Sequence, residues 1–157
     1  MPIKIDLQLA VDGYPVPDAE RIQGWTEAAL HAIRRDAEEM TVRITDEAES
    51  AALNERYRSR RGATNVLSFP FEEPDEVRTG LLGDLVVCAP VVEQEARDQG
   101  KSLDAHWAHM IVHGVLHLCG HDHVEEDTAR RMEDIEKEIM HSLGFANPYD
   151  DDEDTTS

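Results

Sequence analysis

The segment HWAHMIVHGVLHL, residues 106–118, constrains the fold more than any other part of the chain. Apart from four histidines it is almost continuously apolar, and a helix that is apolar on nearly every side has to be buried. Ser102 or Asp104 can cap its first turn, and Gly120 can adopt the left-handed conformation that often ends a helix. The sequence therefore predicts a central helix that the rest of the chain must cover.

Two histidines of this helix have the spacing of metal ligands. His113 and His117 are four residues apart, so their Cβ atoms lie one turn apart, at about 5–6 Å. After Gly120 the chain can fold back and bring His123 to the same point. Three protein ligands leave the fourth tetrahedral position of a Zn²⁺ ion to water, which is typical of a catalytic zinc site. The predicted ligands are therefore His113, His117 and His123, with one zinc ion per chain.

The order of these ligands is that of the metzincin proteases, HExxHxxGxxH. Where those proteases carry the glutamate that acts as general base, this chain has Gly114, so the ligand pattern is kept and the peptidase base is missing. His106 and His109 fall on the same face of the helix as the ligand pair. Because they lie further along the helix, we expect them to be hydrogen-bonded residues and not ligands.

Composition predicts one soluble, globular domain. The chain has 157 residues, of which 40% are hydrophobic, and this is enough for one core of ordinary size. No run of about 18 apolar residues is present, and the first residues are too often charged for a signal peptide. We therefore expect a cytoplasmic protein that has no membrane partner. Two cysteines, Cys88 and Cys119, do not make a disulfide framework.

The distribution of charge narrows the functional classes. A formal net charge of -19 argues against nonspecific attraction to nucleic acid. Part of the acidic excess is in DDDED, and we expect residues 150–157 to be a disordered acidic tail after a domain that spans residues 1–149. Positive charge gathers in NERYRSRRG, which holds Arg56, Arg58, Arg60 and Arg61. A basic patch can therefore exist on an acidic molecule, although a charged loop is usually only solvated.

Alternating strand and helix patterns predict an α/β (α+β) protein, with a small mixed sheet packed by helices around the central metal-bearing helix. Within the apolar strand LLGDLVVCA, Asp84 is either a group that supports the metal site or a solvent-facing strand residue. Pro70 places the strand before it at a sheet edge or near a strand end. The expected strands are residues 3–9, 42–44, 64–71 and 81–89. The first expected helix runs from Asp18 to about Glu39, and the second runs from Thr45 or Asp46 into the arginine cluster. The others run from Pro90 to Gly100, along the central segment, and from beyond His123 to Gly144.

Taken together, these motifs resemble the YbeY family of bacterial endoribonucleases. The resemblance rests on HGVLHLCGHDH preceded by HWAHMIV, and on YRSRRGATNVLSFPF and LLGDLVVC upstream. The blocks cover roughly the middle and C-terminal two-thirds of the chain in the family's order, while the N-terminal strand and helix match only in pattern. The family usually has tyrosine before its Asp-His pair. This chain has His121 there, which leaves His121 open as an alternative or additional ligand.

The resemblance implies a metal-dependent, single-strand-specific ribonuclease that matures ribosomal RNA, notably at the 3′ end of the small-subunit RNA, and that acts in ribosome quality control. It assigns His113, His117 and His123 to zinc and makes Arg58 the catalytic arginine. The expected partners are single-stranded RNA, ribosomal RNA in particular, and ribosomal proteins of the small subunit. Zinc supplies hydroxide at neutral pH, and a guanidinium suits two phosphate oxygens, so both groups fit phosphodiester hydrolysis.

Two other classes of protein remain open from the residues alone. A zinc peptidase would need a base from outside the usual position, for which Asp122 and Asp84 are candidates. A non-catalytic assembly factor would use the metal only as a staple. Such a closed site needs a fourth protein ligand, for which His121 and Cys119 are candidates.

Overall fold

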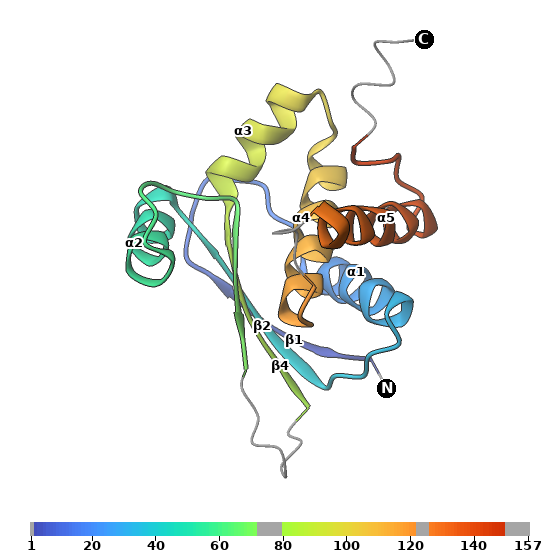
Figure 1. Cartoon of the computed structure of the whole chain (residues 1–157). Helices are drawn as coiled ribbons and strands as arrows, with labels where there is room; N and C mark the ends of the chain where they lie inside the picture. The colour runs from blue at the N-terminus through green and yellow to red at the C-terminus, as the bar shows by residue number, and fades with distance from the viewer. Residues whose placement is uncertain (1, 72–79, 122–125, 150–157) are drawn as a thin grey trace.

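The computed structural model describes residues 2–71, 80–121 and 126–149, which form one sheet with helices on both of its sides (Figure 1). The strands are β1 (Lys4–Leu9), β2 (Glu39–Thr45), β3 (Val66–Pro70) and β4 (Leu81–Cys88). The helices in these ranges are α1 (Ala19–Ala32), α2 (Glu47–Arg58), α3 (Ala89–Gln99), α4 (Leu103–Leu118) and α5 (Glu126–Ser142). The predicted α/β (α+β) fold with a small mixed sheet is confirmed.

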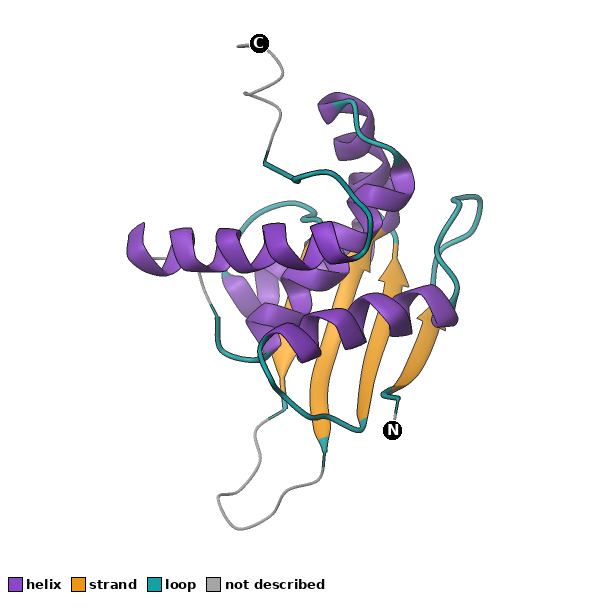
Figure 2. Cartoon of the chain, turned by 90° about the vertical axis from the view of Figure 1, so that its right-hand side faces the viewer, coloured by secondary structure: helices purple, strands orange, loops and turns teal. Residues whose placement is uncertain are grey.

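The sheet has the strand order β1-β2-β4-β3. β1, β2 and β4 are parallel, and β3 runs antiparallel to β4, so β3 forms one edge of the sheet. Figure 1 shows α1, α4 and α5 on one side of the sheet and α2 on the other, and Figure 2 looks onto the helices that lie across the strands. The edge strand β3 therefore lies between the arginine-bearing helix α2 and the histidine-bearing helix α4.

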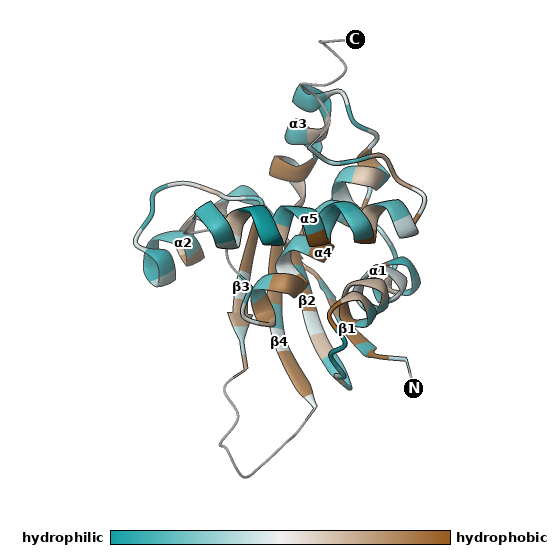
Figure 3. Ribbon diagram, turned by 45° about the vertical axis from the view of Figure 1, so that its right-hand side comes forward, coloured by the Kyte–Doolittle hydropathy of each residue, from teal (hydrophilic) through white to brown (hydrophobic). Residues whose placement is uncertain are grey.

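α4 is the buried central helix that its sequence predicts. It begins where the Ser102 side chain accepts a hydrogen bond from the backbone N–H of Ala105 at 3.1 Å. Trp107, Ile111 and Leu116 are almost completely buried against α1, α3, α5 and the strands β3 and β4. In Figure 3 the outer side of α5 is hydrophilic, whereas the strands beneath the helices are largely hydrophobic. The core thus forms around α4 and fixes its orientation relative to the sheet.

α1 ends at Ala32, and the prediction that this helix runs to about Glu39 was wrong. Asp18 does cap it, since its side chain accepts a hydrogen bond from the N–H of Arg21 at 2.9 Å. The chain leaves the helix at Arg34, which has a φ of 54°. Residues 34–39 are mostly charged residues that favour a helix, so the sequence has no stop signal here. The sheet overrides this preference, because Glu39 pairs with both β1 and β4.

The other boundaries differ only slightly from those predicted. The cap of α2 is Asp46, while Thr45 is buried as the last residue of β2. β3 covers residues 66–70 rather than 64–71, and Pro70 is its last residue on the edge of the sheet. Residues 150–157, the predicted acidic tail, lie outside the described residues. Within the described part of the chain, no helix has the length and apolar character needed to cross a bilayer.

Candidate metal centre

His113 and His117 lie one turn apart near the C-terminal end of α4, and their imidazole rings meet edge-on, with 73° between the ring planes. Their Nε2 atoms are 3.1 Å apart, and the ring centroids are 4.6 Å apart. Two ligands of a tetrahedral zinc ion with bonds of about 2.0–2.1 Å are roughly 3.3 Å apart. The pair is therefore close to the spacing that one metal ion requires. His123, the third predicted ligand, lies outside the described residues.

The carboxylate of Glu136 on α5 lies behind this pair and is only 1% exposed. Its Oε2 is 2.5 Å from Nε2 of His109 and 3.3 Å from Nδ1 of His113. The hydroxyl of Tyr149 lies 3.0 Å from both carboxylate oxygens. Because an ionised carboxylate can only accept hydrogen bonds, each of these neighbours donates to it. His113 then carries its proton on Nδ1, and its Nε2 presents a lone pair toward His117.

The protonation of this cluster follows from its burial and its hydrogen bonds. Burial by itself raises the pKa of Glu136, but the hydrogen bonds from His109 and His113, together with electrostatic attraction to these two side chains, outweigh it and lower the pKa to about 2. Burial lowers the pKa of His109, whose Nδ1 is buried without a hydrogen-bond partner among the described residues. Burial also raises the pKa of Tyr149, and the charge of Glu136 adds to that effect. The cluster is therefore a charged carboxylate held by three hydrogen-bond donors.

A metal ion could occupy either side of His113. The ligand atoms of His109, His113 and Glu136 lie within 4.8 Å of one another, so this group could hold an ion. However, the 2.5 Å between Nε2 of His109 and Oε2 of Glu136 is well below the roughly 3.3 Å between two ligands of one tetrahedral ion. The distance between His113 and His117 is close to that value. The geometry thus favours the side of His113 that faces His117.

Gly114, which replaces the glutamate of the protease motif, faces the sheet. A Cβ atom at this position would come within 2.7 Å of Cδ2 of Leu85 and 3.3 Å of Cγ2 of Val66. Leu85 is completely buried, so its side chain would have to shift within the packed core. No side chain at position 114 can reach the metal site from here. The missing glutamate is thus a consequence of the close packing of α4 on the strands.

We expect Gly114→Ala to destabilise the protein by about 1–3 kcal/mol, because overpacking a filled core outweighs the gain of roughly 1 kcal/mol from replacing a helical glycine. Denaturant unfolding of the metal-free protein measures this difference. Gly24→Ala is the matched control, since Gly24 lies in α1 with nothing within 4 Å of an added Cβ. That variant should be slightly more stable than the parent. Equal stabilisation by both substitutions would contradict the close contact at Gly114.

Arg58, the predicted catalytic arginine, is the last residue of α2 and lies against the edge strand β3. Its Nη2 donates a hydrogen bond to the carbonyl oxygen of Ser68 at 2.5 Å. The hydroxyl of Ser68 donates in turn to the carbonyl oxygen of Gly114 at 3.2 Å, one residue after His113. Ser68 of β3 thus links Arg58 through two hydrogen bonds to α4, the helix that carries His113 and His117. The remaining guanidinium N–H groups make no hydrogen bond to the described residues and are available to an anion.

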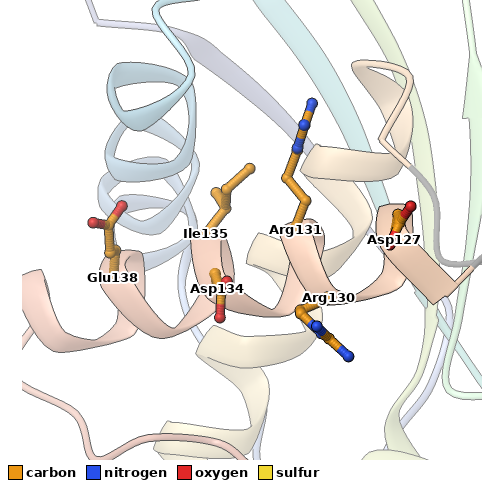
Figure 4. A pocket seen from close by; sticks show the side chains of 6 residues that line it. All are labelled: Asp127, Arg130, Arg131, Asp134, Ile135 and Glu138. Carbon is orange, nitrogen blue, oxygen red and sulfur yellow. The ribbon is translucent and has the colours of Figure 1, made fainter.

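Another hollow lies on the outer side of α5. It has a volume of about 740 Å³. Its lining residues all come from this one helix, and their side chains spread apart rather than converge (Figure 4). They are Asp127, Arg130, Arg131, Asp134, Ile135 and Glu138. A groove without convergent polar groups offers no chemistry, so the histidine cluster is the better candidate site.

Comparison with known proteins agrees with the motifs. The sequence profile described as Endoribonuclease YbeY matches residues 14–144. The chain belongs to the YbeY family. Two proteins named Endoribonuclease YbeY, from Pseudomonas putida (strain W619) and Pseudomonas entomophila (strain L48), are 53% and 52% identical to it over 152 residues, which is 96% of this chain and 96% of each relative. The predicted family is confirmed and, with it, the predicted class of enzyme, a hydrolase that acts on RNA.

The fold is also found in a more distant protein. The solution structure of TM1509 from Thermotoga maritima matches with a TM-score of 0.55 at 22% sequence identity. The match covers 88% of this chain and 91% of that one. This likeness shows that the two proteins share a fold over most of both chains.

Two members of the cluster, Glu136 and Tyr149, were not among the predicted site residues. Glu136 lies one turn beyond Met132 and one turn before Met140, in the buried stripe of α5. A carboxylate in an otherwise apolar stripe is a signal that it has a buried partner, and it could have been found in the sequence. Tyr149 follows the last helix in an irregular segment, and no periodicity indicates its contact. His106 and His109 are hydrogen-bonded, as predicted, the former to Glu95 at 2.9 Å.

Proposed function

We propose that the protein is a zinc-dependent, single-strand-specific endoribonuclease of the cytoplasm, with one catalytic domain over residues 1–149. Its substrate is ribosomal RNA, cleaved at the 3′ end of the small-subunit RNA during maturation and in ribosome quality control. Ribosomal proteins of the small subunit are the proposed partners. The observation that carries the proposal is the facing pair of Nε2 atoms on His113 and His117, 3.1 Å apart in a member of the YbeY family.

The proposed zinc ligands are His113, His117 and His123. Nε2 of His113 presents a lone pair, because its Nδ1 donates to Glu136. An imidazole whose second nitrogen donates to a carboxylate is the usual arrangement of a zinc-bound histidine. The donor set of neutral imidazoles suits zinc, and a bound zinc ion supplies a hydroxide nucleophile at neutral pH. The residues present therefore fit this metal.

Arg58 is the proposed catalytic residue that faces the phosphate. Its guanidinium is held at the edge of β3 by the carbonyl of Ser68 and lies over the ring of Phe69, with 5.6 Å between its carbon and the ring centroid. A guanidinium fixed in this way can donate two parallel hydrogen bonds to phosphate oxygens. It stabilises the negative charge that develops on the phosphoryl oxygens during hydrolysis, and it needs no reorganisation to do so.

The two alternative classes, a zinc peptidase and a non-catalytic assembly factor, have less support. A peptidase base cannot come from position 114, which faces the sheet, and Asp84 is exposed on β4. Leu85, the next residue of β4, faces Gly114 on α4, so Asp84 points to the opposite side of the sheet. Asp122, the other candidate base, lies outside the described residues. A structural staple needs a fourth protein ligand, and burial raises the pKa of the Cys119 thiol, which disfavours the thiolate that a metal ion would need.

Cleavage of matched substrates tests the proposal. The zinc-loaded protein is incubated with an end-labelled RNA strand, with the same strand in a duplex, and with a peptide. We expect cleavage of the single strand only, its loss after chelation, and its recovery when zinc is restored. Cleavage of the peptide without cleavage of RNA would replace the nuclease by a peptidase. Zinc binding without either activity would favour the assembly factor.

Glu136→Gln should lower the affinity for zinc by about 10–100-fold, as is typical when a partner of a metal-bound histidine is changed. Glutamine keeps the size of the side chain but loses the charge and presents an N–H₂ group to donors that need an acceptor. Competition with a chelator, at a temperature at which both proteins are folded, gives the dissociation constant. Glu138→Gln, on the exposed side of α5, is the control and should leave it unchanged. If Glu136→Gln bound zinc as tightly as the parent, Glu136 would not be the residue that positions His113.

A further inference from the structure

Tyr57, near the end of α2, has the most exposed aromatic side chain in the described part of the chain, at 54%. It packs edge-on against Phe69 of β3, with 5.5 Å between the ring centroids and 77° between the ring planes. Phe71, two residues further along the chain, is 44% exposed. A single exposed aromatic residue is ordinary. Tyr57 and Phe69 are instead paired, and they lie beside the proposed catalytic arginine.

Arginines flank both rings of this pair. The guanidinium carbon of Arg56 lies 5.3 Å from the centroid of Tyr57, and that of Arg58 lies 5.6 Å from the centroid of Phe69. Arg60 and Arg61 follow in the exposed loop after α2. Residues 55–61 thus carry four arginines and one glutamate on a chain whose formal net charge is -19. A basic and aromatic surface on an acidic protein is complementary to a polyanion with planar bases.

The edge strand β3 places this surface relative to the histidines. Successive side chains of a strand point to opposite faces of the sheet. Ser68 points toward α4, where its hydroxyl bonds the carbonyl of Gly114, and Phe69 points to the other face, where it meets Tyr57. The guanidinium of Arg58 lies between the two, bonded to the carbonyl of Ser68 and over the ring of Phe69. The aromatic pair Tyr57 and Phe69 therefore lies on one side of the edge strand β3, and the histidine-bearing helix α4 lies on the other. Arg58 lies at the edge between them.

We propose that Tyr57 and Phe69, flanked by Arg56 and Arg58, form a stacking platform for one unpaired base of the RNA substrate. This inference rests on the proposed function, in which a phosphate of the same strand meets Arg58. A base inside a duplex has both faces covered by its neighbours, whereas an unpaired base can turn out and stack on an aromatic ring. The platform thus accounts for a preference for single strands without any contact that reads the base sequence.

Two measurements on the full zinc-loaded chain test the platform. In steady-state cleavage of a single-stranded RNA, Tyr57→Ala should raise KM by roughly 5- to 100-fold, the usual cost of removing one stacking ring, and leave kcat nearly unchanged. Tyr57→Phe keeps the ring and should restore KM. In the second measurement, a 2-aminopurine base in the same strand should lose fluorescence on binding to the parent and to Tyr57→Phe, because stacking quenches it, but not on binding to Tyr57→Ala.

Tyr14→Ala is the matched control. Tyr14 is also exposed, at 38%, but it lies beside Glu47, Glu93 and Glu95, near the other end of α2, so its removal should change neither readout. An unchanged KM and full quenching with Tyr57→Ala would overturn the platform. So would a loss that Tyr57→Phe does not restore, because the hydroxyl and not the ring would then be responsible. If the parent quenches the probe and does not cleave RNA, the proposed function fails and the platform stands.

Discussion

His113→Ala and His117→Ala should each reduce bound zinc from about one ion per chain to a small fraction, with loss of RNA cleavage. Only two of the three proposed ligands remain in either variant, and two imidazoles do not hold a zinc ion against solvent and chelators. Metal analysis of the purified proteins after dialysis measures the effect. Both histidines are at least partly exposed, so the metal-free variants should remain folded.

Two further variants make this test specific. His121→Tyr introduces the residue usual in the family at a neighbouring histidine and should retain its zinc. Loss of zinc in that variant would assign the third ligand to His121 instead of His123. If the ion were held by His109, His113 and Glu136, then His117→Ala would keep it and His109→Ala would lose it. That pattern would overturn the proposed ligand set and leave a metal site in place.

Arg58→Ala should lower cleavage of single-stranded RNA by about 100-fold or more, the effect typical of removing one preorganised group that stabilises developing charge. Zinc content should stay the same, because no proposed ligand depends on this side chain. The hydrogen bond to Ser68 is a single, partly buried one, so the free energy of unfolding should change by only about 1 kcal/mol. Cleavage rates, metal analysis and thermal unfolding on the same preparations measure the three quantities.

Two other arginine variants separate geometry from charge. Arg58→Lys should recover only part of the activity, because an ammonium keeps the charge and loses the two parallel donors. Arg60→Ala, in the exposed loop two residues on, removes the same charge from the patch and should have a much smaller effect. Similar rates for Arg58→Ala and the parent would show that Arg58 is one more solvated arginine of its loop. Equal losses in the Arg58 and Arg60 variants would indicate a general effect of charge.

The parts of the fold that the sequence predicts correctly are those where local preference and burial agree. Asp18 and Ser102 cap their helices as expected, and α4 is buried because its residues are apolar on nearly every side. The end of α1 was mispredicted because the preference for a helix and the pairing of β2 compete there. Pairing with β1 and β4 depends on residues far along the chain, and a local pattern cannot report it.

In the candidate site, too, the local pattern predicts one part, and contacts between distant segments determine the other. The spacing of His113 and His117 is sufficient to predict that they face one point, since both lie on one helix. The carboxylate behind them comes from α5, and the hydroxyl that completes its hydrogen bonds comes from Tyr149. These contacts depend on how helices pack across one another, which spacing along the sequence does not determine.

The contact between Tyr149 and Glu136 forms late during synthesis of the chain. Ribosomes add residues from the N-terminus onward, so α4 with His113 and His117 is made well before Glu136, and Glu136 is made before Tyr149. The carboxylate that orients His113 therefore has its full set of donors only when nearly the whole described chain has been synthesised. A nascent chain stopped before this residue carries both histidines but has an incompletely held carboxylate behind them. The full set of hydrogen bonds around the histidine cluster thus depends on synthesis of the segment that follows α5.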